Sequence, residues 1–478
     1  MKDSKLIYAL NHLDVYELNR FKKFINSPYF NSNVKVTALF NALEKHLKKE
    51  SKLPIKEKLF EKIYGKEKYN DNRFRKLNTD LLSLFEDFLA NEKFQNSKLS
   101  KINFLLSNLS ERRLEKLYNA ILRQSKRYTE QSFSKTSNFY YEQFSLQKNI
   151  FTLTSEFERK AKSKKELRDF NIPEISYNLD LFYIIEKLRY MITVLSWQSV
   201  RNQKVEINFI DDIIKIIENS ALLRNRVVQI YYLTYKTYVE SDNEEHFFKL
   251  KALINEYLEI FPIHEAKEIF ESAFTYCVGK ANKGKSEYQI EVLELYKVAL
   301  ESDVLLVDGF ISPTTFRNIT MSALRLNQFS WIEEFNTKYA KKLNPKYAHS
   351  ILSYNRAMLS FYRKDFNSVI EHLINFEYEE IHFALGAKAL LLATYYELDE
   401  EEALFSFLDS FNIYVVRNNQ IVPGRKLNYK NLIGFTRKLS RLKHTDLSKL
   451  PNLKEEILKT NSIASKQWLL EKIEELEN

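Results

Sequence analysis

The sequence is poor in the residues that interrupt regular structure, because its 478 residues include only seven glycines and eight prolines. A sheet-rich or α/β chain of this length usually needs several times as many turn formers, so the scarcity favours helices. Cysteine is almost absent as well, since Cys277 is the only one. A single cysteine excludes an intramolecular disulfide and any cysteine-based zinc or iron–sulfur site, which is typical of a reducing compartment.

Long apolar runs are missing too. The longest, such as Tyr190 to Trp197, are far shorter than the roughly 20 residues that a membrane span needs. The first residues, MKDSKLIYALNHLD, contain no apolar segment of the kind found in secretory signal peptides. Because 44% of the residues are hydrophobic and 14% are aromatic, the chain can still bury a large core. We therefore expect a folded, soluble, cytoplasmic protein without a membrane span.

The net charge of +10 is unevenly distributed along the chain. Residues 1–170 carry 35 Lys and Arg against 21 Asp and Glu, residues 171–416 carry 25 against 35, and residues 417–478 carry 13 against 7. Basic ends therefore flank an acidic middle. Such an asymmetry occurs in proteins that bind nucleic acid or acidic partners, and also where Lys-rich helices are simply solvated.

Apolar residues recur at three- and four-residue spacing along almost the whole chain, as at Phe182, Ile185 and Leu188. This is the pattern of amphipathic helices, and the short polar segments between them suit antiparallel helix pairs. Only Val304–Val307 and Tyr414–Arg417 suggest extended structure, and neither has an evident partner strand. The sequence thus predicts an all-α solenoid, a superhelix of antiparallel helical hairpins.

Three regions are expected from the charge distribution and the repeats. They are a basic N-terminal helical region (1–170), helical repeats (171–416) and a basic C-terminal helical cap (417–478). The first boundary is placed at the charged stretch Lys160–Pro173, which ends at a proline. Whether residues 1–170 form a separate domain or the first turns of one solenoid stays open.

Two neighbouring segments, AMLSFYRKDFNSVIEHL and LLATYYELDEEEALFSFL, repeat one pattern at an offset of 34 residues. The offset aligns aromatic, acidic and aliphatic positions in order: Phe361 with Tyr395, Tyr362 with Tyr396, Asp365 with Asp399, Val369 with Ala403, Ile370 with Leu404, and Leu373 with Phe407. Over roughly residues 220–415 this arrangement resembles the tetratricopeptide repeat. Because Val, Ile or Phe often replaces the small residues of that family, the resemblance implies tetratricopeptide-like hairpins rather than consensus repeats.

The segment FKKFINSPYFNSNVKV (Phe21–Val36) predicts a helix, a corner at Pro28 and a second helix from about Val34, capped by Asn31 or Asn33. We predict that two aromatic residues, Tyr29 and Phe30, fill the gap between the helices. The alternative is that they are exposed stacking platforms beside three lysines, as single-stranded nucleic acids prefer. These lysines are Lys22, Lys23 and Lys35.

The chain as a whole is similar to a group of long helical proteins without an assigned function. The similarity rests on an N-terminal SPYFN element (Ser27–Asn31) and a segment like SPTTFRNIT (Ser312–Thr320). It implies a helical fold and supplies no activity.

The first candidate binding surface is C-terminal and comprises six cations: Arg417, Arg425, Lys426, Lys430, Arg437 and Arg441. The last three fall at i, i+7 and i+11 and so share one helical face, with Leu432, Phe435 and Leu439 on the opposite side. Such a cluster suits carboxylates or phosphates. The alternative is an ordinary solvated face of a helix that closes the solenoid.

A secondary candidate lies in the segment Pro54–Leu89. Arg73, Arg75 and Lys76 open its second helix, where a helix-turn-helix protein places its groove-reading residues. The connection Gly65–Asn70 is longer than the usual turn of that motif. The alternative is a basic first turn that is only solvated.

The segment GKANKGKS (Gly279–Ser286) matches the phosphate-binding loop pattern, in which Lys285 would reach phosphates and Ser286 would hold magnesium. That loop requires a preceding strand in a parallel sheet, whereas Ile269–Val278 continues a helical pattern. We predict a glycine-containing turn between two helices, and a nucleotide hydrolase is a remote alternative.

No catalytic, metal-binding or cofactor-binding residues are assigned, and no cofactor is expected. HEAKE (His264–Glu268), for instance, lacks the second histidine of a helical zinc site. The function expected is a non-enzymatic scaffold or adaptor that binds a protein or peptide through a helical-repeat surface. The alternative is a nucleic-acid-associated protein that uses the basic N-terminal and C-terminal surfaces. The sequence indicates neither the partner's identity nor the oligomeric state.

Overall fold

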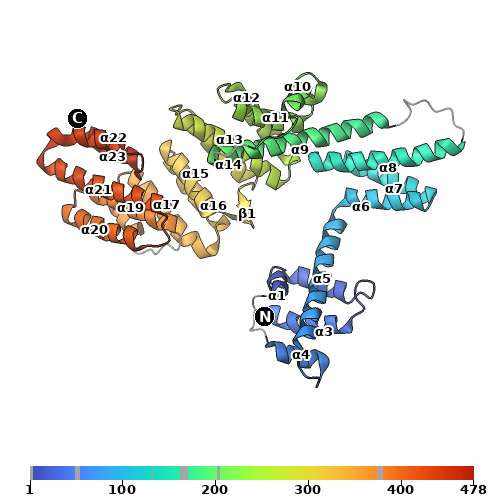
Figure 1. Ribbon diagram of the computed structural model, residues 1–478. Helices are drawn as coiled ribbons and strands as arrows, with labels where there is room; N and C mark the ends of the chain where they lie inside the picture. The colour runs from blue at the N-terminus through green and yellow to red at the C-terminus, as the bar shows by residue number, and fades with distance from the viewer. Residues whose placement is uncertain are drawn as a thin grey trace. The chain divides into compact units, whose positions relative to one another are not determined.

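The computed structural model describes residues 4–48, 54–132, 134–161, 171–201, 205–373 and 381–477 (Figure 1). Over these residues the predicted all-α class is confirmed, with 23 α-helices and a single two-stranded hairpin. No helix in this part of the chain combines the length and apolar character that a membrane crossing requires. Two compact units, Met1–Ile184 and Ile185–Asn478, divide the chain within helix α9 (Ile172–Arg201). The expected boundary at Lys160–Pro173 overlaps residues 162–170, which lie outside the described residues.

Unit 1 begins with five helices around a phenylalanine-rich core: α1 (Lys5–Leu10), α2 (Val15–Ile25), α3 (Val34–Leu47), α4 (Lys56–Tyr64) and α5 (Asp71–Asn96). Phe21 is fully buried and meets Phe40 and Phe85 edge-on, at ring-centroid distances of 5.1 and 5.5 Å. Asp14 caps α2, and the Asn33 side chain accepts a hydrogen bond from the Lys35 backbone N–H at 3.0 Å. The predicted helix, corner and second helix are therefore confirmed.

The predicted burial of both corner aromatics is wrong for Tyr29, which is 89% exposed, while Phe30 is 43% exposed and stacks on Phe24 at 4.0 Å. The corner is closed by a polar side chain instead. The Asn31 amide donates to the Ile25 carbonyl at 2.9 Å and to Thr37 Oγ1 at 3.0 Å. Because Asn31 ties the two helices together, no aromatic plug is needed and the rings remain on the surface.

The rest of unit 1 comprises α6 (Lys98–Glu111), α7 (Glu115–Glu130), α8 (Ser137–Ala161) and the first part of α9. Leu106, Tyr118 and Leu146 lie in its small apolar core. The buried carboxylate of Glu142 accepts hydrogen bonds from Ser100 Oγ at 2.5 Å and Asn103 Nδ2 at 2.7 Å, which compensates its loss of water.

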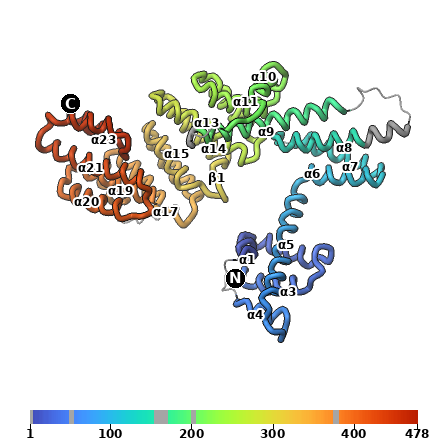
Figure 2. The backbone as a smooth tube through the Cα atoms, viewed as in Figure 1, coloured from blue at the N-terminus to red at the C-terminus, as the bar shows by residue number. Residues whose placement is uncertain are grey.

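In unit 2, helices from α11 onward pack against the helices that precede and follow them in the chain. In addition, α11 contacts α13, α15 contacts α17, and α17 contacts α19. Figure 2 shows the chain reversing at each turn between these helices. Short 3₁₀ turns lie at Ala221–Arg224, Leu258–Ile260, Ala340–Lys342 and Leu447–Lys449. The helices are α10 (Ile210–Glu218), α11 (Arg226–Val239), α12 (Glu245–Tyr257), α13 (Ile263–Asn282), α14 (Tyr288–Glu301), α15 (Pro313–Arg325), α16 (Phe329–Tyr339), α17 (Pro345–Tyr362), α18 (Phe366–Leu373), α19 (Ile381–Glu397), α20 (Glu401–Arg417), α21 (Pro423–Thr445), α22 (Leu450–Lys459) and α23 (Lys466–Glu477).

The two candidates for extended structure have different outcomes. Part of Val304–Val307 forms β1 (Leu306–Val307), which pairs antiparallel with β2 (Phe310–Ile311). Between them Asp308 and Gly309 both have positive φ, 51° and 81°, as a tight type I′ hairpin requires. Tyr414–Arg417 lies in α20, so the extended prediction is wrong there. The helical spacing of buried side chains continues through that segment to Val415 and outweighs the local alternation.

Four hairpins of unit 2, α13/α14, α15/α16, α17/α18 and α19/α20, end their first helix in the same way. A residue with positive φ follows each helix, namely Gly284, Asn327, Lys364 and Asp399. The next backbone N–H then bonds to the carbonyl five residues earlier, at 2.9–3.3 Å. This is the Schellman closure, which satisfies carbonyls left open at a helix end. The hairpins thus share one turn although their sequences differ.

The spacing of these turns corrects the predicted register. From Gly284 the positive-φ position recurs after 43, 37 and 35 residues, at Asn327, Lys364 and Asp399. The counterpart of Lys364 is Asp399, and buried Val369 accordingly corresponds to buried Leu404. The 34-residue offset is therefore one residue short. It aligned Asp365 with Asp399 because both are acidic, although Asp365 instead accepts a hydrogen bond from the first-turn N–H of Ser368.

Replacing Gly284 by alanine is expected to destabilise the α13/α14 hairpin by about 1 kcal/mol, since an L-residue resists its φ of 94°. Gly279 is the matched control, because it lies in α13 without positive φ and Cβ atoms at both positions would meet nothing within 4 Å. Gly279→Ala is expected to stabilise by about 0.5–1 kcal/mol. Amide hydrogen exchange in α13 and α14 measures both changes, and equal losses of protection would contradict this assignment of the turn.

Candidate functional site

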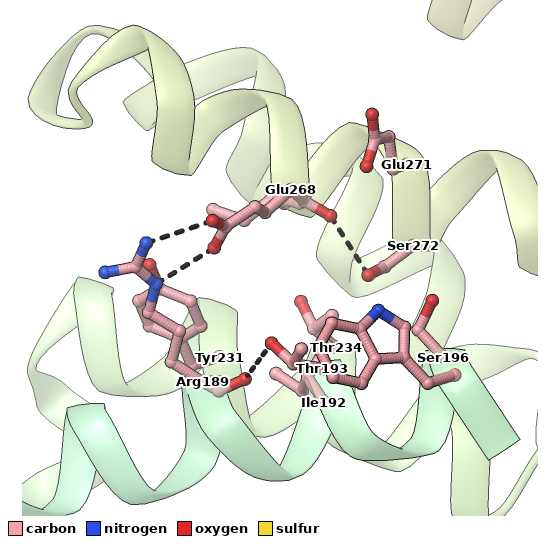
Figure 3. Close-up of a pocket in the computed structure, with 11 residues that line it drawn as sticks. Arg189, Ile192, Thr193, Ser196, Tyr231, Thr234, Glu268, Glu271 and Ser272 are labelled. Carbon is pink, nitrogen blue, oxygen red and sulfur yellow. Dashed lines mark hydrogen bonds and ion pairs between the residues drawn. The ribbon is translucent and has the colours of Figure 1, made fainter. Parts of the chain in front are cut away.

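A cavity of about 250 Å³ lies between α9, α11 and α13 of unit 2 (Figure 3). Small-molecule pockets usually occupy roughly 300–1,000 Å³, so this cavity suits a single side chain better than a whole ligand. We call it the α9/α11/α13 pocket. Its polar and aromatic lining comprises Arg189, Thr193, Ser196 and Trp197 from α9, Tyr231 and Thr234 from α11, and Glu268, Glu271 and Ser272 from α13.

One wall of the pocket is organised by Arg189. Its Nε and Nη2 donate to the two carboxylate oxygens of Glu268 at 2.9 and 3.0 Å, a bidentate pair. Two further carboxylates approach the same guanidinium, that of Glu265 at 3.8 Å and that of Glu186 at 3.9 Å. Hydrogen bonding to Glu268 raises the pKa of Arg189, so the guanidinium stays charged. Three carboxylates therefore share one cation.

The deepest member of this network is Glu265, which is only 3% exposed. It sits in the first turn of α13, where a carboxylate complements the helix dipole. The hydroxyl of Tyr231, itself buried, donates to Glu265 Oε2 at 2.7 Å. Burial, reinforced by this carboxylate, raises the pKa of Tyr231, which keeps the phenol neutral and able to donate.

Three hydroxyls of the lining are limited to accepting hydrogen bonds from a bound group. The hydroxyls of Thr193, Thr234 and Ser272 each donate to the carbonyl four residues earlier in their own helix, at 3.0, 2.8 and 3.0 Å (Figure 3 draws two of these bonds). Since each hydroxyl has one hydrogen, only lone pairs remain for a bound group. Glu271 adds an exposed carboxylate, and Trp197, 61% exposed, adds an aromatic surface. The complement of this lining is a cationic, donor-rich group.

A metal ion is not the occupant that this geometry indicates. Nowhere in the described residues do three or more His, Cys, Asp or Glu side chains converge as metal ligands do. The guanidinium of Arg189 lies between the carboxylates of Glu186, Glu265 and Glu268, where a metal ion would have to bind.

The predicted C-terminal surface lies partly on α21, where Leu432, Phe435 and Leu439 are buried as expected. Its cations are not all available to a partner. Arg437 pairs with Asp409 of α20 at 2.5 Å, and Arg441 lies over the ring of Phe405, 5.7 Å from its centroid. These two arginines fasten α21 to α20. Lys430 is exposed, and no side chain in the described part of the chain forms an ion pair with it.

The other three predicted cations lie at the α20–α21 connection. Lys426 donates to the Val416 carbonyl at 2.9 Å and so caps the end of α20, while Arg425 Nη1 contacts His382 Nδ1 at 2.6 Å. Arg417 is exposed. Lys426 and Lys430 line an open hollow of about 510 Å³ together with apolar Ile421, Pro423 and Leu427. The structure thus brings the cluster together but engages most of it internally.

The secondary candidate is also partly engaged within the protein. Arg73 pairs with Glu67 at 2.5 Å, and Arg75 pairs with Asp71 at 2.7 Å, in the same turn of α5. Lys76 is exposed.

The phosphate-loop-like segment has the predicted helical context. Gly279 lies in α13, the segment before it is helical, and Gly284 forms the turn. Lys285 forms an ion pair with Glu244 at the start of α12, and buried Lys280 lies 3.5 Å from the same carboxylate. Burial raises the pKa of Cys277, which marks it as a core thiol.

Sequence reasoning missed the α9/α11/α13 pocket. Its residues come from three helices, and lining residues on different helices are more than 30 positions apart in the sequence, as Arg189, Tyr231 and Glu268 illustrate. One local signal existed. Glu265 and Glu268 of the HEAKE segment are spaced i, i+3, so both carboxylates face one side of α13.

Comparison with protein-family models, with curated proteins and with solved structures finds no match to this chain. No relative's activity therefore bears on the pocket.

Proposed function

We propose that unit 2 is a tetratricopeptide-like superhelix that acts as a non-enzymatic scaffold for a protein partner. Two observations support the superhelix: successive hairpins share the Schellman turn, and each packs on the next through apolar residues. Stacked hairpins of this kind present extended surfaces on which a peptide can lie. Because each hairpin contacts mainly its neighbours, every added hairpin extends the surface, and the hairpins do not need to share a single hydrophobic core.

The observation that carries this proposal is the α9/α11/α13 pocket. Its lining combines carboxylates in excess over one guanidinium, three hydroxyls limited to accepting, and the exposed ring of Trp197. A lysine or arginine side chain offers the matching properties, namely positive charge, several N–H donors and attraction to an aromatic face. The pocket therefore binds one basic side chain of the partner.

Selection of displayed random peptides on the full-length protein tests this function. We expect the selected peptides to share a Lys or Arg, and their affinity to fall about tenfold in Trp197→Ala and in Glu271→Gln, as lost cation–π and charge contacts predict. Trp197→Phe retains an aromatic face and should keep most of the affinity. Glu301→Gln, which removes an exposed charge from the end of α14, is the matched control. Selection of peptides without basic residues, or full binding by Trp197→Ala and Glu271→Gln, would contradict the proposal.

A further inference from the structure

A second surface lies on unit 1 and does not depend on the pocket. The Nζ of Lys35, in the first turn of α3, lies 4.2 Å from the ring centroid of Tyr64 at the end of α4. The guanidinium of Arg73, in the first turn of α5, lies 4.6 Å from the same centroid. Lys35 and Arg73 therefore meet at the ring of Tyr64, and Lys35 follows Phe30 of the α2–α3 corner by five residues along the chain. We call these five residues, Tyr29, Phe30, Lys35, Tyr64 and Arg73, the corner surface.

The corner surface presents aromatic rings in a fixed position. Tyr29 is 89% exposed, and its ring meets Phe30 edge-on at 5.1 Å. Phe30 in turn stacks on Phe24 of α2. The Ser27 carbonyl accepts bonds from the N–H groups of Phe30 and Asn31 at 3.1 and 3.0 Å, which holds the backbone of the corner. A ring so exposed on a braced backbone is available to stack on a partner without a large ordering cost.

The charge around these rings is positive. Residues 21–37 contain three lysines and no acidic residue, and residues 54–76 contain eight Lys and Arg against four Asp and Glu. Among the four acids, Asp71 is engaged by Tyr69, Arg75 and Lys56. The Arg73–Glu67 pair is about half exposed on both sides, and such pairs are weak enough for a phosphate to replace the carboxylate. An anionic partner is therefore favoured.

We propose that the corner surface binds single-stranded nucleic acid. A base stacks on Tyr29, and the adjoining phosphates contact Lys35 and Arg73. Exposed rings among cations match the flexible, unstacked bases and the charged backbone of a single strand. A duplex would instead require a helix that enters a groove, whereas the exposed ring of Tyr29 lies in the corner between α2 and α3 and not on a helix.

The test is fluorescence anisotropy of the full-length protein with labelled oligothymidine and oligouridine of about 20 nucleotides. Both strands should bind, and affinity should fall steeply between about 50 and 200 mM salt. Tyr29→Ala should weaken binding about tenfold, as the loss of one stacked base predicts. Lys35→Ala should reduce the slope of log affinity against log salt by about 0.7, the value for one phosphate contact on a single strand.

The matched control is Tyr16→Ala. Tyr16 is 77% exposed and stands in the first turn of α2, one helix length, roughly 15 Å, from the corner. Because both tyrosines are exposed, neither substitution threatens the core. Equal effects of Tyr29→Ala and Tyr16→Ala would overturn the proposal, as would no binding of either strand at low salt. Equally tight binding of poly-glutamate would also overturn it, since the surface would then recognise negative charge alone. Preference between the two strands identifies RNA or DNA as the source.

Discussion

Replacing Arg189 by methionine is expected to destabilise unit 2 by about 3–5 kcal/mol, the cost of leaving the buried carboxylate of Glu265 without its cation. The side chain of Glu265 is only 4% exposed and that of Arg189 is 20% exposed. Without the guanidinium, Glu265 retains the Tyr231 hydroxyl, and Glu268 loses both of its short bonds. Amide hydrogen exchange in α11 and α13 should report the loss, because these helices carry the remaining partners.

The control for this prediction is a surface arginine. Arg363 pairs with Glu333 at 2.6 Å, but the two side chains are 39% and 55% exposed, so water can replace either partner. Arg363→Met should therefore cost less than about 1 kcal/mol. In the Arg189→Met background, Glu265→Gln removes the buried charge and should recover part of the stability. Similar small losses in Arg189→Met and Arg363→Met would show that the α9/α11/α13 network contributes no more than a surface pair.

Replacing Gly386 by alanine is expected to destabilise the α17–α19 contact by about 1–3 kcal/mol through overpacking. A Cβ at this position would lie 2.6 Å from the hydroxyl oxygen and 3.2 Å from Cζ of Tyr354. Tyr354 is only 5% exposed and belongs to the core of unit 2, so its ring has little room to move. The absence of a side chain at Gly386 is therefore what allows α19 to approach α17 at this point.

The same substitution has the opposite expected sign at Gly434. This residue is exposed on α21, and a Cβ there meets nothing within 4 Å, so alanine should stabilise the helix by about 0.5–1 kcal/mol. Thermal unfolding and hydrogen exchange in α19 and α21 measure the two effects. Tyr354→Phe, which removes the clashing oxygen, should rescue part of the loss in Gly386→Ala. A stabilised Gly386→Ala variant would mean that α17 and α19 adjust freely, against the packing described.

The two proposed partners, a peptide and a single-stranded nucleic acid, bind to different parts of the chain. The pocket of unit 2 carries excess negative charge, whereas the corner surface of unit 1 carries excess positive charge. The uneven charge along the sequence is thus reflected in two surfaces with opposite preferences. Failure of peptide binding at the pocket would leave the nucleic-acid proposal untouched, because the two share no residue.

How far the sequence sufficed is clearest at the repeats. It located the helices of the α17/α18 and α19/α20 hairpins, because apolar spacing and caps are local properties. It misplaced their alignment by one residue, because two residues of the same type need not adopt the same backbone conformation. Asp399 adopts positive φ after α19, whereas Lys364 does so after α17. The sequence likewise marked Tyr29 as noteworthy but could not show its exposure, which depends on the bonds made by Asn31.

The sequence by itself determined the all-α class, since the period of its apolar residues and the scarcity of glycine and proline act within single helices. It also determined where basic and acidic residues lie along the chain. Only the tertiary structure decided which charges remain available. Arg437 of α21 forms an ion pair with Asp409 of α20, and Arg189 of α9 lies beside Glu265 and Glu268 of α13, which are distant in the sequence. Packing of side chains from separate helices sets those contacts, and no local pattern encodes it.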